Sequence, residues 1–368
     1  MAKTRIIYQS VGLFVAPDAG PATGSHAGAV KQFNRVQNIN WSANIAKTDV
    51  NELGRLAAID RPIIEPPTVS MDFSYFPTNG WNESIAGFDV TGASSAITKI
   101  IDTVPATAEG EKNYFIVVGK EGSDLVGFDL AANATNVGVI SIGNGFITNY
   151  SFEAAVGQFP TATINIEALN IKFNTGYAAI DIPAVDPSSG LPASGTFTIP
   201  TGITNPAAGN GTGISALRPG DVVLTIPTGA SLGSGTVGTT QVHIQSVSLD
   251  VPMSREPINK LGSKFPFSRE ITFPINVTMS VSALARDIQE GRNLATYITA
   301  DHADDLAVTI TAPGSATEAL KFELRNATLE SENYSQAIGS NGTVEFNWSG
   351  QLGGPEDVIN GLFITQHA

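Results

Sequence analysis

The feature that most constrains the fold is an internal repeat. Displacing the 368-residue chain by 208 positions places residues 36–74 over residues 244–282 without a gap, and 10 of the 39 positions are identical. Composition alone gives about two or three identities over such a length. A displacement of 182 positions then places residues 144–170 over residues 326–352, with five further identities. Because both matches keep the same order along the chain, the sequence predicts one structural unit that occurs twice.

The repeat also divides the chain. It predicts a first unit at residues 1–172 and a second unit at residues 213–368. Residues 173–212 are rich in Pro, Gly, Ser and Thr and have no sustained periodicity, so they are expected to form a long linker or an arm laid on a neighbouring molecule, of which we favour the arm; a segment folded back on its own unit is the further alternative.

Apolar and polar residues alternate within each unit, which is typical of strands with one buried face. Ile39, Trp41, Ala43 and Ile45, for example, alternate with polar neighbours and are expected to face a core. The same alternation recurs in residues 69–75, 163–167, 246–253 and 343–349. We therefore expect a mainly β fold, in which each unit is a small β-sandwich or curled sheet.

One helix is expected in each unit. Ile97, Ile100 and Ile101 have the i, i+3, i+4 spacing of a helix face, which predicts a helix packed against the first sheet. The same spacing occurs in the second unit at Leu294, Tyr297 and Ile298.

Residues that carry chemistry are scarce. The absence of cysteine excludes disulfides, cysteine-ligated metals and thiol nucleophiles. His302 is flanked by Asp301, Asp304 and Asp305, which suits either an oxygen-rich metal site or the solvated end of a helix, and we favour the latter. No nucleophile elbow or phosphate-binding loop is found, so no catalytic, cofactor-binding or metal-binding residue is assigned, no cofactor is expected, and the chain is not expected to be an enzyme.

The charge and hydropathy limit the possible partners. The chain has 34 acidic and 20 basic residues, which gives a net charge of −14, and no run of Lys and Arg. Such a chain repels phosphate, so tight nucleic-acid binding is not expected. No apolar run approaches the length of a membrane span or a signal peptide, so we expect a soluble protein made in the cytoplasm, with no membrane partner.

Four stretches resemble the tail tube family of bacteriophage major tail proteins. They are residues 37–42, 49–54 and 65–75, together with residues 327–344, which are similar to the last hairpin of that family. The resemblance implies a structural virion protein located in the tail and made in the host cytoplasm. Its copies would join their sheets edge to edge into rings, and the rings would stack into a conduit for genomic DNA with other tail proteins as partners.

The resemblance also implies a ring symmetry and a lumen. Where single-unit members form hexameric rings, a chain with two units would form a trimeric, pseudo-hexameric ring. An acidic channel wall would let DNA pass without tight binding. Strand alternation nominates Asp72, Glu167, Asp250 and Glu345, opposite the apolar rows, as facing the lumen; alternatively they face outer solvent or ring contacts. The expected stacking segments are residues 17–28, 49–56, 174–210, 226–238 and 257–264 and the tail after Gly353.

Two other classes of protein share parts of this pattern. A β-sandwich decoration or adhesin module, binding carbohydrate or a capsid surface, is the alternative function, and it should show clustered exposed aromatic residues. Trp41 and Trp348 instead occupy apolar strand positions, and Trp81 is expected alone in a turn. A hydrolase that uses carboxylates would need an acid pair within reach in a cleft.

Overall fold

The structure is a computed structural model of the chain. It describes residues 10–16, 30–64, 66–101, 110–119, 125, 137–186, 191–197, 199, 220, 222–225, 244–266, 268–284, 303–311, 318–338, 341–355 and 357–366. Strands dominate these residues, so the prediction of a mainly β fold is confirmed. No helix in the described part of the chain is long and apolar enough to cross a membrane.

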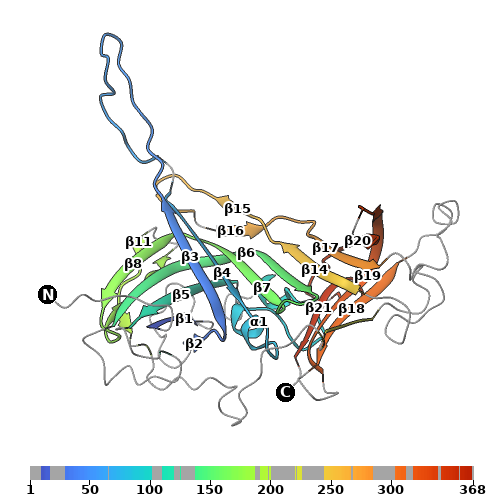
Figure 1. The fold of residues 1–368 in the computed structure, drawn as a ribbon. Coiled ribbons are helices and arrows are strands. Elements are labelled where there is room, and N and C mark those ends of the chain that lie inside the picture. The colour runs from blue at the N-terminus through green and yellow to red at the C-terminus, as the bar shows by residue number, and fades with distance from the viewer. Residues whose placement is uncertain are drawn as a thin grey trace.

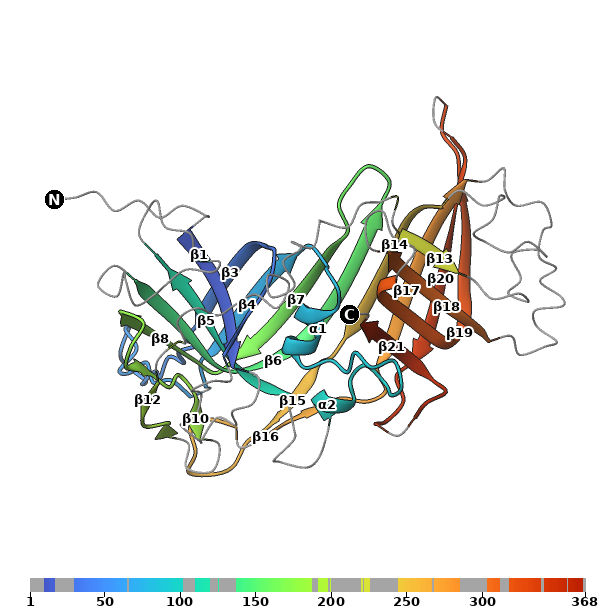
Figure 2. The same cartoon turned by 90° about the horizontal axis from the view of Figure 1, so that it is seen from below.

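One antiparallel sheet runs through both halves of the chain (Figures 1 and 2). Its strands follow one another in space in the order β3 (Val36–Asn44), β4 (Thr68–Tyr75), β7 (Thr161–Ala168), β6 (Gly138–Ala155), β14 (Ile244–Pro252), β17 (Asn276–Leu284), β20 (Thr343–Gln351) and β19 (Glu318–Ser335). We call this the continuous sheet.

The two longest strands pass from the continuous sheet into a second layer. Strands β6 and β19 have 18 residues each, and their first halves belong to this second layer together with other strands. In the first half of the chain these are β1 (Val11–Ala16), β2 (Lys31–Gln32), β5 (Glu111–Val118) and β8 (Asn170–Thr175). In the second half they are β13 (Val222–Thr225), β18 (Asp304–Thr311) and β21 (Gly361–Gln366). The passage occurs at Asn144 and Asn326, whose φ values of 56° and 54° are left-handed, a conformation that Asn tolerates better than most residues.

The strand pairings of the two halves recur at constant offsets. The ladder between β3 and β4 begins with Val36 opposite Tyr75, and the ladder between β14 and β17 begins with Ile244 opposite Ala283. Each residue of the second pair therefore lies 208 positions after its counterpart in the first pair. Both ladders contain a register shift after this first pair. The pairs between β6 and β7 likewise recur between β19 and β20 at an offset of 182, again with a matching shift. The two halves therefore have the same strand order and register along these ladders.

A protruding hairpin follows the first strand of each ladder. Residues 45–64 extend far from the body between β3 and β4, as Figure 1 shows, and are held by an isolated bridge between Val50 and Asp60. The matching bridge, at the same offset of 208, joins Ile258 to Ser268 within the hairpin of β15 (Arg255–Ile258) and β16 (Ser268–Ile271). We call these hairpin 1 and hairpin 2.

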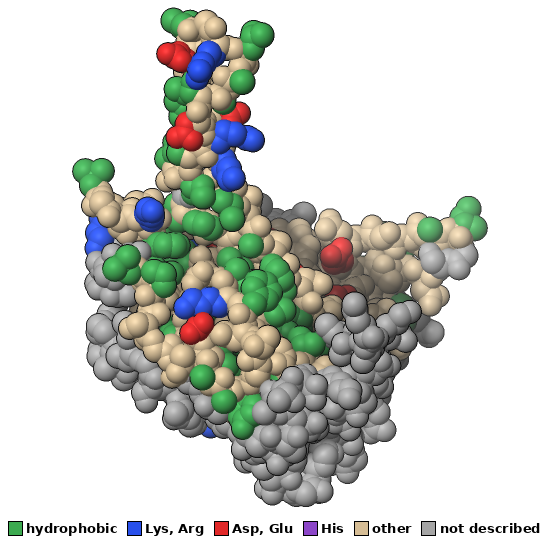
Figure 3. All heavy atoms as spheres, turned by 90° about the vertical axis from the view of Figure 1, so that its left-hand side faces the viewer, with side chains coloured by type: hydrophobic (Ala, Val, Ile, Leu, Met, Phe, Trp, Pro, Cys, Tyr) green, Lys and Arg blue, Asp and Glu red, His purple; other side chains and the backbone are tan. Residues whose placement is uncertain are grey.

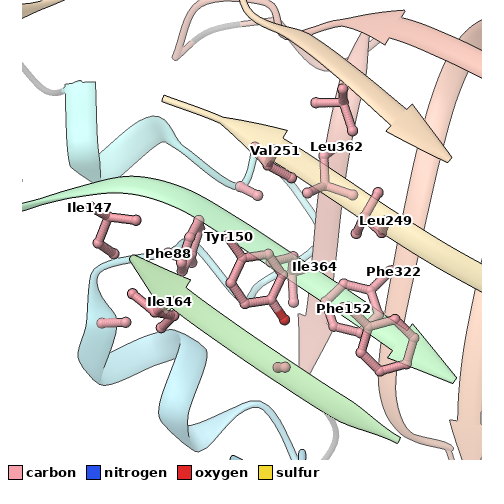
Figure 4. Packing of buried hydrophobic residues seen from close by; sticks show 14 of the residues in the cluster. Phe88, Ile147, Tyr150, Phe152, Ile164, Leu249, Val251, Phe322, Leu362 and Ile364 are labelled. Carbon is pink, nitrogen blue, oxygen red and sulfur yellow. The ribbon is translucent and has the colours of Figure 1, made fainter. Parts of the chain in front are cut away.

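One large apolar core lies between the layers of both halves. It includes Trp348, Tyr150 and Phe322, each fully buried, and it continues without interruption across the boundary between β6 and β14 (Figure 4). Burial of aromatic side chains of this size contributes strongly to folding, because about 25 cal/mol is gained for each Å² of apolar surface removed from water.

The helices differ from the prediction. The described residues of the first half contain two short ones, α1 (Trp81–Ala86) and α2 (Thr98–Ile101), and α2 is a single turn that buries Ile100. Trp81 begins α1, and its indole nitrogen donates a hydrogen bond to the Gln32 carbonyl at 3.2 Å, so it does not stand alone in a turn. The helix expected at residues 294–298 lies outside the described residues.

The connector also differs from a plain linker in its described part. Strands β9 (Ile180–Asp181), β10 (Val185–Asp186), β11 (Leu191–Pro192) and β12 (Thr196–Phe197) form two short antiparallel pairs. Ile180, Ile182 and Ile199 are buried in a second apolar cluster with residues of β1 and β5. Of the three expectations, folding back on its own unit describes these residues, because isoleucines spaced along the segment supply an apolar face. Strand β8 also crosses the expected boundary at residue 172.

Candidate assembly site

The four nominated carboxylates lie on one face of the continuous sheet. Directly paired residues share a face in an antiparallel sheet, and the registers connect Asp72 to Asn165 on β7, two residues from Glu167. Asp250 is opposite Ser151 on one side and Thr278 on the other, and Thr278 is opposite Ser349, four residues from Glu345. The other residues of this face include Asn40, Ser42, Ser70, Thr163, Asn149, Ser248, Ser280, Ser282 and Asn347. None of the residues named is basic.

The environments of the four carboxylates are not equal. Asp72 is half-buried and accepts a hydrogen bond from the Asn40 amide at 2.9 Å. Asp250 is also half-buried and accepts one from Asn149 at 3.0 Å. Glu345 is exposed. Glu167 is exposed too, but its carboxylate lies 3.5 Å from the Arg269 guanidinium, so its charge is partly neutralised.

The two halves are joined by pairing between β6 and β14. Seven residue pairs form this junction, from Ser246 opposite Ala155 to Pro252 opposite Asn149. On the core side, Tyr150 and Phe152 of β6 are buried beside Leu249 and Val251 of β14, as Figure 4 shows. The junction is therefore a complete interface, with a backbone ladder and an apolar core, between two parts of one chain that have the same strand order.

Hairpin 2 reinforces this junction by reaching across to the first half. Arg255 lies over the Phe146 ring at 4.2 Å, and Arg269 lies over the same ring at 5.7 Å while donating to the Glu167 carbonyl at 3.3 Å. Such cation–π contacts stabilise by about 0.5–2 kcal/mol each. Burial lowers the pKa of Arg255 to about 10, and the nearby charge of Glu111 opposes this shift. The pKa of Glu111 is itself raised by burial.

Two edges of the continuous sheet have no strand partner among the described residues: β3 on one side and residues 328–335 of β19 on the other. Strand β3 is exposed over most of its length. Of the residues predicted to face a core, Ile39 is half-buried and packs against the main apolar core, whereas the prediction is wrong for Trp41, Ala43 and Ile45, which are exposed in the isolated chain. Trp41 is 38% exposed and only leans edge-on against Phe173, with ring centroids 5.8 Å apart. The physical reason is position, because an alternating strand at a sheet edge has no neighbour to cover its apolar side.

Glu83 on α1 is a fully buried acid. Tyr75 donates to its carboxylate at 2.8 Å and Tyr150 at 3.3 Å, and the other carboxylate oxygen has no partner. Burial raises the pKa of Glu83, while the two hydroxyl donors oppose the rise. Because the group is enclosed in the core below β6 and β4, it positions two tyrosines rather than facing a substrate.

Metal binding finds no support in the described part of the chain, where no group of three or more His, Asp and Glu side chains could hold an ion. Asp305 accepts a hydrogen bond from the Asn326 backbone. His302 and Asp301 lie outside the described residues, as do residues 17–28 and 226–238.

The sequence did not predict that Arg255 and Arg269 contact the first half of the chain. A signal was present, because the repeat alignment places Lys47 opposite Arg255 and Arg61 opposite Arg269, which keeps two basic residues at the same positions of both hairpins. What the hairpins contact could not be read from the alignment.

No protein-family model matches the chain, and no curated protein sequence matches it.

Proposed function

We propose that this protein is the structural subunit of a phage tail tube. It contains one unit twice, and three copies close into a pseudo-hexameric ring whose polar sheet faces line a channel for DNA. The support is the junction between β6 and β14, which joins two parts with the same strand order, while the two matching strands at the outer edges, β3 and β19, stay unpaired among the described residues. Joining copies through these edges repeats an interface that the chain already contains.

The internal junction specifies the register of the contact between copies. The equivalent of β14 is β3, at the offset of 208, and the equivalent of the end of β6 is the end of β19, at the offset of 182. Leu249 opposite Phe152 therefore becomes Trp41 opposite Tyr334, and Asp250 opposite Ser151 becomes Ser42 opposite Asn333. Trp41 and Tyr334 are both exposed apolar residues, at 38% and 63%, and the pairing would cover both.

Ring closure is also consistent with the charge and the edges. Three chains carry a charge of −42 per ring, and the polar face would repel phosphate rather than bind it at many sites. Closure pairs every edge of the continuous sheet, which removes the aggregation hazard of exposed strands.

Hairpin tips supply candidates for stacking between rings. Leu53 and Leu261 sit at equivalent tips, each followed by a left-handed glycine, and both leucines are fully exposed. An exposed leucine at the end of a projecting hairpin costs free energy in water and is covered when another surface receives it.

Electron microscopy of concentrated protein tests the proposal directly. We expect rings or tubes with a central channel and threefold symmetry. A protein that stays monomeric at high concentration and gains thermal stability from a sugar would refute the tube and favour the adhesin.

Cysteine pairs test the register, since the chain has no native cysteine. The hydrogen bonds from Val156 to Gln245 and from Met253 to Thr148 mark hydrogen-bonded pairs, so Asp250 and Ser151 form a close, non-hydrogen-bonded pair. We expect Ser42→Cys with Asn333→Cys to form a disulfide between copies. The matched control, Ser42→Cys with Ser335→Cys, places the two residues diagonally at about 7–8 Å and should cross-link poorly.

A further inference from the structure

A polar cleft of about 570 Å³ lies at the outer end of the second half. Its lining includes Asn326, Thr328, Glu330, Ser349, Asp357 and Asn360. Glu330 is exposed, and its carboxylate accepts a hydrogen bond from the Ser349 hydroxyl. Asp357 is partly exposed as well, and hydrogen bonds from Asn360 and Ile359 lower the pKa of its carboxyl. The cleft is therefore lined by two solvent-accessible carboxylates and several amide and hydroxyl groups.

The equivalent place in the first half is occupied. At the offset of 182, Thr328 corresponds to Phe146 and Ser349 corresponds to Glu167. Phe146 and Glu167 are the residues that receive Arg255 and Arg269 of hairpin 2. In the first half this surface is thus a binding site for a hairpin. Hairpin 2 reaches it because hairpin 2 follows β14, which pairs with β6 beside the site.

Hairpin 1 is the counterpart of hairpin 2 in the repeat, so it is the hairpin expected to bind the corresponding cleft of the second half. In the isolated chain it projects into solvent. Figure 1 shows it standing clear of the body, and Figure 3 shows acidic and basic side chains along it. Its Lys47 and Arg61 stand where hairpin 2 has Arg255 and Arg269. Arg61 is 66% exposed at its side chain and is paired with Asp49 of the same hairpin. Its guanidinium has five N–H donors, so it can bind a second carboxylate.

The charges of the two surfaces are complementary. In the first half, the acid facing Arg269 is Glu167 itself, whereas the second half has Ser349 at that position. The hydrogen bond from Ser349 holds the Glu330 carboxylate beside this position, so an acid is present there again. We propose that the cleft is the docking site for hairpin 1 of an adjacent copy of this chain, with Arg61 paired to Glu330.

This proposal rests on the proposed ring, and it adds a second contact to the strand pairing. Hairpin 1 begins directly after β3, so the copy whose β19 pairs with β3 is also the copy that offers the cleft. One neighbour supplies both contacts, as the first half does for β14 and hairpin 2 within the chain.

A charge exchange tests the pairing. Arg61→Glu and Glu330→Arg should each raise the protein concentration needed for ring assembly by about tenfold or more, since each places like charges together in a partly enclosed contact. The double variant should return that concentration to within about threefold of the native value. Arg55→Glu is the matched control for ring closure, because Arg55 lies on the same hairpin, is 3.9 Å from the Glu52 carboxylate and has no counterpart in the contacts of hairpin 2. Single rings of this variant should form at the native concentration, and any effect should be confined to the stacking of rings through the hairpin tip.

Each outcome decides a different claim. If the native chain forms no rings, the proposed function fails and takes this inference with it. If the native chain forms rings and both single variants assemble like it, the cleft is not the docking site, while the tube remains. Weakened single variants without rescue in the double variant would also overturn the pairing. Thermal unfolding of the dilute variants verifies that each monomer is folded, because both side chains reach solvent in the isolated chain.

Discussion

Truncating Trp41 should weaken assembly, because it removes apolar surface that a neighbouring copy would cover. Trp41 is 38% exposed on the unpaired edge strand β3. A Trp side chain presents about 250 Å², so roughly 95 Å² is left for a neighbouring copy to cover. At about 25 cal/mol per Å², covering this area is worth about 2 kcal/mol per contact.

Each chain contributes one such contact to the ring. A loss of about 2 kcal/mol corresponds to about a 30-fold weaker association between copies. A closed ring of three chains loses three such contacts, and the concentration at half-assembly of a trimer varies as the square root of its overall dissociation constant. We therefore expect Trp41→Ala to raise the concentration at which rings form by roughly 150-fold, measured by sedimentation velocity over a range of protein concentrations. Val223→Ala is the control, since Val223 is exposed to a similar degree, at 42%, on β13 in the second layer rather than on a free edge of the continuous sheet.

The reasoning fails if Trp41→Ala assembles within about threefold of the native concentration while rings still form. In that case β3 would not be a contact strand, and the exposed tryptophan would need another explanation. It also fails if Val223→Ala weakens assembly as strongly, because the effect would then follow lost apolar surface in general.

Two further predictions concern buried polar groups. The pKa of Glu83 is raised in the folded state above its ordinary value of 4.5, so the stability that its proton contributes is fully present below pH 4.5 and is lost as the pH rises through the folded pKa. A glutamine at this position has no such proton to lose, so urea unfolding from pH 4.5 to pH 8 should show Glu83→Gln gaining stability relative to the native chain as the pH rises. A difference in stability that stays constant with pH would contradict this. Asn144→Ala should cost about 3 kcal/mol, because it adds left-handed strain and removes two buried hydrogen bonds with Val185, of 2.6 and 3.0 Å. Asn326→Ala, at the equivalent exposed position, should cost only about 1 kcal/mol, and equal losses in thermal unfolding would refute the distinction.

The sequence by itself determined the local structure of this protein. Alternation of polar and apolar residues is a property of neighbouring positions, so it identified the strands at residues 69–75 and 343–349 and placed Asp72 and Glu345 opposite the apolar rows. The repeat offsets of 208 and 182 were also visible, and the strand registers follow both of them. The duplication that these offsets predict remains part of the proposal.

Only the tertiary structure decided which strands become neighbours and which edges stay free. The pairing of β6 with β14 joins strands that are far apart in the sequence, and no local pattern encodes it. It explains why Leu249 is buried while Trp41, at the same position of the repeat, is exposed. It also decides that hairpin 2 covers Phe146 while hairpin 1 reaches into solvent. The physical reason is that burial depends on what lies across from a side chain in space, and among the described residues of the isolated chain nothing pairs with the free edge of β3.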